Sequence, residues 1–170
     1  MNSKRILPMR KVVVNTTPLL VFGNIGRLDI LRKLYGTIYI ANAVYEEVLE
    51  KNDKASATVF SANDWIKVLK IENPKDYAMY SAKLHAGEVE TMILAQQKSL
   101  QADLVILDDL SARKTAKFLG LTVTGSIGVL IKAKNQGIIS EVKPLLDEII
   151  KNGFFVSNKI YDDILRLSGE

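Results

Sequence analysis

Two adjacent carboxylates, Asp108 and Asp109, end a short apolar run that begins after Asp103. A short run of β-prone residues without polar alternation is typical of a strand buried on both faces, as in a parallel sheet covered by helices. In open α/β sheets, ligands bind just beyond the carboxyl ends of the strands, which is where these two side chains fall. Taken alone, however, the pair is better explained as a loop start or a helix N-cap.

Further polar side chains fall at comparable places in the predicted elements. Asn15 follows the first predicted strand, and Glu88 lies in the first turn of a predicted helix. Glu46 and Glu47 flank the apolar stripe of another predicted helix equally, so the helical period does not distinguish between them. The ordinary roles of these glutamates are surface charge for the adjacent pair and compensation of the helix dipole for Glu88.

A cluster of carboxylates favours a bound cation. Carboxylates repel each other, and a dry site holds them together only with cations between them. Two divalent ions about 3.5 to 4 Å apart can activate water and stabilise the leaving oxygen in phosphodiester hydrolysis. The chain has no cysteine and one histidine, so a metal site must be built mainly from oxygen ligands, which suit Mg²⁺ or Mn²⁺ better than Zn²⁺. The single His85 is predicted to be a capping or surface residue, because nothing nearby would orient it as a base.

The distribution of charge is compatible with a polyanionic partner. The formal net charge is +4 and the sequence pI is about 9.2. A basic segment directly after a carboxylate pair suits a site that attracts phosphates while it holds cations. For any single lysine there, a solvated helix face is the better explanation. Between Leu110 and Lys134 the only charged residues are Arg113, Lys114, Lys117, Lys132 and Lys134.

A second candidate contact for phosphate follows the next predicted strand, which ends at Thr124. The segment from Gly125 to Gly128 is made of small residues around Ile127, and a phosphate backbone could approach it closely. Thr124 and Ser126 are therefore candidate substrate contacts, although a plain tight turn explains the segment more simply.

Short buried strands alternate with amphipathic helices along the chain. This order predicts an α/β fold, a three-layer α/β/α domain with a mostly parallel central sheet. The segment Trp65 to Ile71 alternates in polarity and is expected to be an edge strand. Pro74 to Leu84 is predicted to be helical, and His85 to Gly87 is predicted to break the chain before a helix that starts at Glu88. The other predicted strands cover residues 11–15, 37–40 and 121–124, and the other predicted helices include residues 28–35, 41–52, 53–64, 111–119, 142–150 and 158–167.

Length and composition predict one globular domain that spans residues 1–170, with residues 1–10 as a flexible basic N-terminus. No stretch reaches the length of a membrane span, and the N-terminus lacks the long apolar core of a signal peptide. The absence of cysteine is compatible with a reducing compartment. The expected protein is soluble and cytoplasmic, without a membrane partner.

Six blocks of sequence follow one another from about Val12 to the C-terminus. They are Val-Val-Val-Asn-Thr-Thr-Pro-Leu-Leu, Ile-Gly-Arg-Leu-Asp-Ile-Leu, Ala-Val-Tyr-Glu-Glu-Val, Ala-Gly-Glu-Val-Glu-Thr-Met-Ile-Leu-Ala, Leu-Asp-Asp-Leu-Ser-Ala-Arg and Val-Thr-Gly-Ser-Ile-Gly-Val-Leu. As an ordered set they resemble a PIN domain. More narrowly, the chain is similar to the DUF3368-like branch related to VapC-type toxins, whose members carry the Asp-Asp-x-x-Ala-Arg and Thr-Gly-x-x-Gly-Val-Leu blocks.

The resemblance implies a metal-dependent endoribonuclease that holds Mg²⁺ or Mn²⁺ and hydrolyses RNA. It favours Glu47 over Glu46, and Thr17 matches a small hydroxyl residue that supports the first position of the site. It also implies that the protein is the toxin of a type II toxin–antitoxin pair, forms homodimers and is covered by a cognate antitoxin. The positions that match the acidic quartet are Asn15, Glu47, Glu88 and Asp109, with Asp108 beside the last. The residues expected at the substrate are Thr17, Arg113, Lys114, Lys117, Thr124 and Ser126.

Asn15 departs from the aspartate that is usual in the broad family. An amide oxygen can ligate magnesium but brings no charge, so the site should hold metal more weakly. This supports an alternative hypothesis, a non-catalytic PIN-fold module that binds RNA or another protein. A third hypothesis is a receiver-like phosphotransfer domain, which would need a phosphorylatable aspartate where Asn15 stands.

Overall fold

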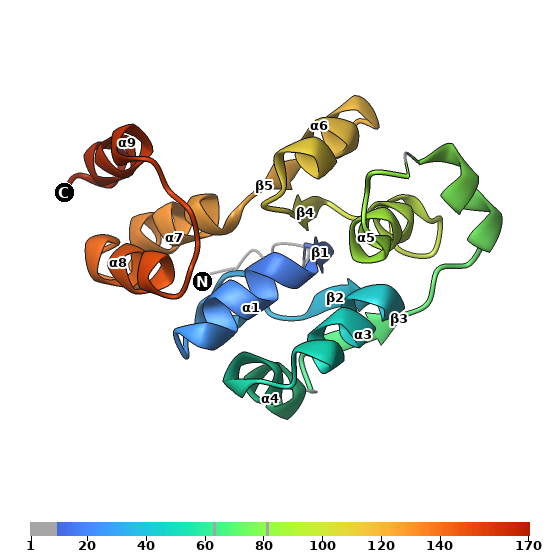
Figure 1. Ribbon diagram of the computed structural model, residues 1–170, viewed down its shortest axis with the longest axis horizontal. Coiled ribbons are helices and arrows are strands. Elements are labelled where there is room, and N and C mark those ends of the chain that lie inside the picture. Colours follow the sequence, from blue (N-terminus) through green and yellow to red (C-terminus); the bar gives the residue numbers. More distant parts are fainter. Residues whose placement is uncertain (1–9, 63, 81) are drawn as a thin grey trace, which may run out of the picture.

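The computed structural model describes residues 10–62, 64–80 and 82–170 of the chain (Figure 1). The predicted flexible N-terminus, residues 1–10, lies outside the described residues except for Arg10. Within the described part of the chain, no helix is long and apolar enough to cross a membrane.

One central sheet contains five parallel strands in the order β3-β2-β1-β4-β5. All residues of β1 and β4 are buried, as predicted for strands covered on both faces, and Val14 of β1 lies opposite Ile106 of β4. The strand order reverses between β1 and β4, and this switch point is where open α/β sheets bind ligands. The strands are β1 (Val12–Val14), β2 (Ile38–Ala41), β3 (Ile66–Leu69), β4 (Leu104–Ile106) and β5 (Val123–Thr124).

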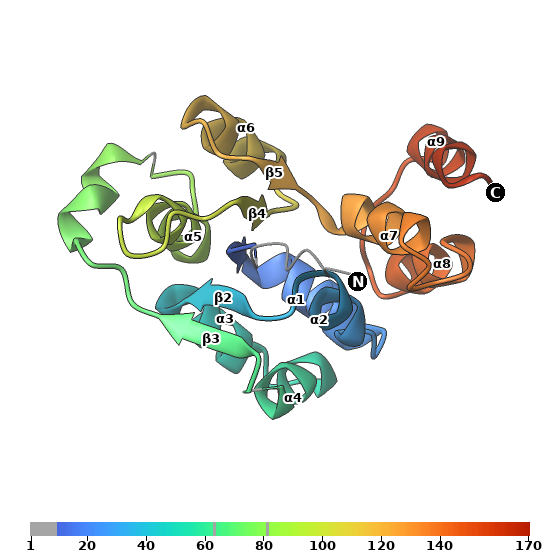
Figure 2. The ribbon, with the colours of Figure 1, turned by 180° about the vertical axis from the view of Figure 1, so that it is seen from behind.

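Helices cover both faces of this sheet, which confirms the predicted three-layer architecture. Figure 1 shows α1, α3 and α4 on the near face, and Figure 2 shows α2 on the opposite face. The helices are α1 (Thr16–Asn24), α2 (Asp29–Tyr35), α3 (Asn42–Lys51), α4 (Lys54–Ser61), α5 (Ala86–Gln96), α6 (Leu110–Phe118), α7 (Ser126–Asn135), α8 (Lys143–Lys151) and α9 (Asn158–Ser168), with a short 3-10 helix, η1 (Pro74–Met79).

Two predicted boundaries are wrong. The predicted helix from Pro74 to Leu84 is reduced to η1, which has no buried residue and therefore no packed face to support a longer helix. The predicted break at His85 to Gly87 is shorter than expected, because α5 already begins at Ala86. Gly87 is thus a buried residue in the first turn of α5, and its small size has a role in the site.

The C-terminal helices pack beside α1. α8 contacts α1, and α9 contacts α7. The Glu170 carboxylate accepts hydrogen bonds from the backbone N–H groups of Val142 and Lys143 at the start of α8, and it pairs with Lys134 of α7 at 3.2 Å. These contacts connect α7, the start of α8 and the residue that follows α9.

Candidate active site at the carboxyl edge of the sheet

Asn15 lies directly beyond β1, at the centre of the sheet edge. Its backbone N–H donates to the carbonyl of Ile106 at 3.0 Å, so it is level with the end of β4. Asn15 is also the N-cap residue of α1, but its side chain makes no capping hydrogen bond. The buried Oδ1 instead accepts from the hydroxyl of Thr91 on α5 at 3.4 Å. The amide oxygen therefore faces the space between α1 and α5.

Glu47 of α3 faces the same space. The Thr16 hydroxyl donates to one carboxylate oxygen of Glu47, and the Gly87 N–H donates to the other at 2.8 Å. Glu46 is exposed to solvent. The structure thus distinguishes between two glutamates that the helical period left equivalent.

Gly87 allows this position of Glu47. A Cβ atom at Gly87 would lie 2.5 and 2.7 Å from the two Glu47 carboxylate oxygens. Real Cβ atoms do not come this close, so any larger residue would displace the carboxylate. The sequence indicated only a chain break here, because nothing local reports the approach of α3.

Glu88 is buried next to two other carboxylates. Its side chain accepts a hydrogen bond from the backbone N–H of His85, the N-cap residue of α5, at 3.0 Å. Burial raises the pKa of Glu88, and the negative charges of Asp109 and Glu47 raise it further. Asp109 and Glu47 therefore both lie close enough to Glu88 to repel its charge, which is an electrostatic condition that favours a bound cation.

We expect Glu88→Gln to raise the melting temperature of the metal-free protein at pH 7 slightly, by about 2 °C. The folded-state pKa of Glu88 is raised, so its protonated form contributes stability below the ordinary pKa of 4.5 that is lost as the pH rises through the folded-state value. The advantage of the amide should therefore vanish in acid. Thermal melts in EDTA from pH 4 to pH 8 check this, and a variant less stable than the parent at pH 7 would contradict it.

The adjacent aspartates after β4 have different environments. Asp108 accepts from the Ser126 N–H at 2.7 Å and from the Ser126 hydroxyl at 2.6 Å. Burial raises the pKa of Asp108, while these two bonds and the charge of Arg113 oppose the shift. Asp109 is exposed and caps α6, with its Oδ1 accepting from the Ala112 N–H at 2.8 Å. Asp109 is the aspartate that interacts electrostatically with Glu88, whereas Asp108 connects β4 to α7.

The hydroxyl groups of Ser126 and Thr124 contact neighbouring parts of the protein. Ser126 is completely buried, and its hydroxyl is used by Asp108. The Thr124 hydroxyl lies against Gly128, where an added Cβ would overlap it. The small residues of this turn allow β5 and α7 to pack closely, so the simpler alternative, a tight turn, fits the structure better than a phosphate contact.

We expect Asp108→Ala to reduce the free energy of unfolding by about 2 kcal/mol, because it leaves the buried N–H and hydroxyl of Ser126 unpaired. Asp109→Ala should cost only about 1 kcal/mol, the typical effect of losing an N-cap. Urea unfolding of the two variants measures the difference. If Asp109→Ala were the more damaging change, the assignment of Asp108 as the structural member of the pair would be wrong.

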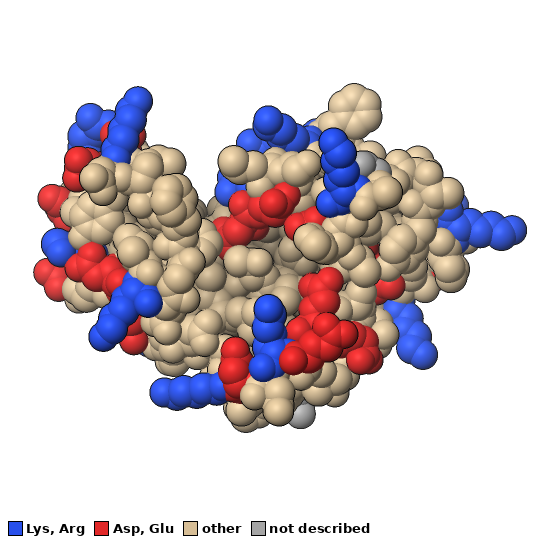
Figure 3. Space-filling view, in the orientation of Figure 1, with Lys and Arg blue, Asp and Glu red and all other residues tan. Residues whose placement is uncertain are grey.

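The converging side chains line one cavity with a volume of about 430 Å³. Figure 3 shows acidic side chains gathered around a hollow in this face, with basic side chains nearby. Thr17, from the predicted set, lies on the wall, as does His85. The lining residues are Asn15, Thr16, Thr17, Leu20, Glu47, Glu50, Lys51, His85 and Glu88.

The predicted basic residues of α6 do not behave alike. The Arg113 guanidinium lies beside Gly125, where a Cβ atom would come within 2.5 Å of Nη1, and its charge acts on Asp108. Lys114 and Lys117 are exposed to solvent. Lys51, which is not among the predicted site residues, lines the acidic cavity itself.

The potential metal ligands at the cavity are of the element that a hard divalent cation prefers. Asn15, Glu47 and Glu88 in the cavity wall, and Asp109 near Glu88, offer only oxygen, which Mg²⁺ and Mn²⁺ prefer. Among residues 10–62, 64–80 and 82–170, however, no three Asp, Glu or His side chains are close enough together to form a metal site. Glu47 and Asp109 each accept a hydrogen bond from a backbone N–H of the protein instead.

The protein thus has an all-parallel α/β sheet with an acidic, oxygen-lined cavity beside its switch point. These features place it in the class of doubly wound proteins, which bind ligands at the carboxyl edge of the sheet. Residues 11–170 match the family model DUF3368, a PIN domain, and the chain belongs to this family. A PilT N-terminus domain protein, SSO1118 from Sulfolobus solfataricus P2, is similar in structure with a TM-score of 0.46 and 14% sequence identity, over 86% of this chain and 98% of that chain. No curated protein matches the sequence.

Proposed function

We propose that this protein is a metal-dependent endoribonuclease that hydrolyses RNA phosphodiester bonds. PIN domains are in general nucleases that use divalent metals, and the chain belongs to that family. The observation that carries the proposal for this chain is the convergence of Asn15, Glu47 and the buried Glu88 on one cavity, with Asp109 close enough for its negative charge to act on Glu88.

Asn15, Glu47, Glu88 and Asp109 would hold Mg²⁺ or Mn²⁺. When bound there, such an ion would supply an activated water and would stabilise charge on the phosphate. The protein contributes position: Thr16 and Gly87 orient Glu47, and Thr91 orients the amide of Asn15. The exposed Lys114 and Lys117 on the helix capped by Asp109 would attract the RNA backbone.

The similarity of the sequence to VapC-type toxins supports a role as the toxin of a type II toxin–antitoxin pair. In that role a cognate antitoxin would cover the acidic cavity, and the protein would act as a homodimer. Co-expression with an adjacent open reading frame, followed by size-exclusion chromatography, would test both associations.

The direct test of the proposed activity is cleavage of a fluorescently labelled single-stranded RNA by the purified protein. We expect cleavage with Mn²⁺ or Mg²⁺ and none with EDTA. Purified Glu88→Gln serves as a control for contaminating ribonuclease, because it should bind the column and elute like the parent but lack activity. Equal cleavage by both preparations, or cleavage that persists in EDTA, would overturn the proposal.

One observation favours a second candidate, a non-catalytic module that binds RNA or protein. Asn15 contributes no charge, and the described carboxylates do not form a metal cage as they stand. If this alternative holds, Asn15→Asp should increase Mn²⁺ affinity and create cleavage that the parent lacks. If the site is tuned for asparagine, the variant should cleave no faster than the parent. The receiver-like hypothesis lacks its phosphorylatable aspartate, because β1 ends in Asn15.

A further inference from the structure

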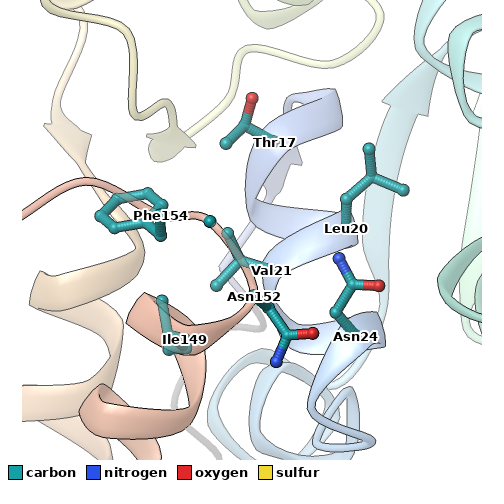
Figure 4. A pocket seen from close by; sticks show the side chains of 8 residues that line it. Thr17, Leu20, Val21, Asn24, Ile149, Asn152 and Phe154 are labelled. Atoms are coloured by element: carbon teal, nitrogen blue, oxygen red, sulfur yellow. The ribbon is translucent and has the colours of Figure 1, made fainter.

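A second cavity, with a volume of about 180 Å³, lies between α1 and the end of α8 (Figure 4). In Figure 4 the Phe154 ring and the carboxamides of Asn24 and Asn152 surround Val21. No lysine, arginine, aspartate or glutamate lines this cavity, so its occupant is expected to be uncharged. The lining residues are Thr17, Leu20, Val21, Asn24, Ile149, Asn152, Gly153 and Phe154.

This cavity adjoins the acidic one. Thr17 and Leu20 of α1 line both cavities. From Thr17 to Asn24 the axis of α1 advances about 10 Å, at roughly 1.5 Å per residue. If one phosphate of a polymer lies at the acidic cavity, a group on the same or a nearby nucleotide can therefore reach the second cavity.

The polar groups of the cavity can form hydrogen bonds with the edge of a planar ligand. Within the described chain, the Asn24 carboxamide has no hydrogen-bond partner although it is partly buried, so it offers both a donor and an acceptor. The Asn152 Nδ2 donates to the carbonyl of Glu148 at 2.8 Å, which leaves the Oδ1 as a free acceptor. The cavity thus offers N–H donors on both carboxamides and two acceptor oxygens over an apolar floor.

The backbone at the C-terminal end of α8 positions Asn152 and Phe154. Gly153 adopts a φ of +97°, a backbone conformation that favours glycine, and its N–H donates to the carbonyl of Ile150 at 3.0 Å. The Phe154 N–H then donates to the carbonyl of Ile149 at 3.3 Å, which turns the chain back over the helix end. Asn152 and Phe154 are therefore presented to α1 by a defined helix end.

We propose that this cavity binds an unpaired nucleobase of the RNA whose phosphate lies at the acidic cavity, and that it prefers bases with an exocyclic amino group. The inference rests on the proposed function. Proteins read single-stranded RNA by stacking splayed bases on aromatic rings and by hydrogen bonds to base edges, and Phe154 with the two asparagines supplies both. Cytosine offers two N–H donors on one amino group and a ring acceptor, whereas uracil has a single N–H donor for the two acceptors of the cavity.

The test compares binding of labelled oligocytidylate and oligouridylate by fluorescence anisotropy, in Mg²⁺. The protein carries Asp109→Asn so that the RNA stays intact. We expect oligocytidylate to bind about tenfold more tightly, within the range known for base contacts. Asn152→Ala should remove most of this preference, and Asn24→Ala should weaken the binding of both RNAs. Gln136→Ala, which changes an exposed carboxamide at the C-terminal end of α7 that does not line the cavity, should alter neither affinity.

Equal affinities for the two RNAs, or a preference that survives Asn152→Ala and Asn24→Ala, would overturn the subsite. The parent protein is assayed for cleavage in parallel. Cleavage without any base preference in binding would reject the subsite and leave the nuclease proposal intact. A preference that depends on Asn152, in a parent that does not cleave, would support the subsite and reject catalysis. No RNA binding by any variant would reject both.

Discussion

An Asp109→Asn variant is expected to keep its fold and to lose RNA cleavage by about 100-fold or more, the scale typical of removing one charge-stabilising group from a catalytic site. Asparagine caps helices as well as aspartate does, so the hydrogen bond to the Ala112 N–H should survive. The change removes one of the two negative charges that act on Glu88. Circular dichroism and melting temperature establish the fold, and single-turnover cleavage with saturating Mn²⁺ measures the loss.

Asp162→Asn is the matched control, because Asp162 is an exposed aspartate on α9, distant in the chain from the acidic cavity. It should cleave at the parental rate. An Asp109→Asn variant with the same rate as this control would exclude Asp109 from the catalytic site, and the assignment of the cavity would fail with it.

Gly87→Ala is expected to lower cleavage by about 10- to 100-fold, the range seen when residues that orient a metal ligand are changed. The new Cβ would overlap both Glu47 carboxylate oxygens, so the flexible side chain must turn away from its present position. Stability should hold or rise by up to about 1 kcal/mol, because alanine favours helices more than glycine. Cleavage rate and urea unfolding of the same preparation should therefore move in different directions.

Gly23→Ala provides the contrasting control. Its Cβ would lie 3.1 Å from the Ala55 carbonyl oxygen of α4, a backbone atom that cannot turn away as a side chain does. We expect lower stability with little change in the cleavage rate of the folded protein. If Gly87→Ala instead cleaved normally, Glu47 would not need its present position, and its place in the site would be refuted.

Much of the framework could be predicted from the sequence because its periodicity is local. Apolar triplets without alternation are typical of buried parallel strands, and the polar residues that follow them must lie at the carboxyl edge. Asn15 and Asp109 were placed correctly on this basis. The parallel sheet and its helical layers also follow from the alternation of elements, since neither depends on a particular side-chain contact.

The detailed contacts of the site could not be predicted, because they join residues far apart in the chain. Nothing near Thr16 or Gly87 in the sequence indicates that both donate to Glu47. The distinct environments of Asp108 and Asp109 depend on Ser126, eighteen positions further on. The second cavity depends on α8 returning to α1, and an amphipathic pattern alone does not reveal which surface a helix will cover.

The most direct test of the central claim is a calorimetric titration of the full chain with Mn²⁺, with Asp109→Asn measured beside it. The account predicts saturable binding by the parent, loss of that binding or at least a tenfold weaker affinity in the variant, and normal binding by Asp162→Asn. Binding of equal strength to the parent and to Asp109→Asn would place the metal elsewhere. No binding by the parent would contradict a metal site at the acidic cavity.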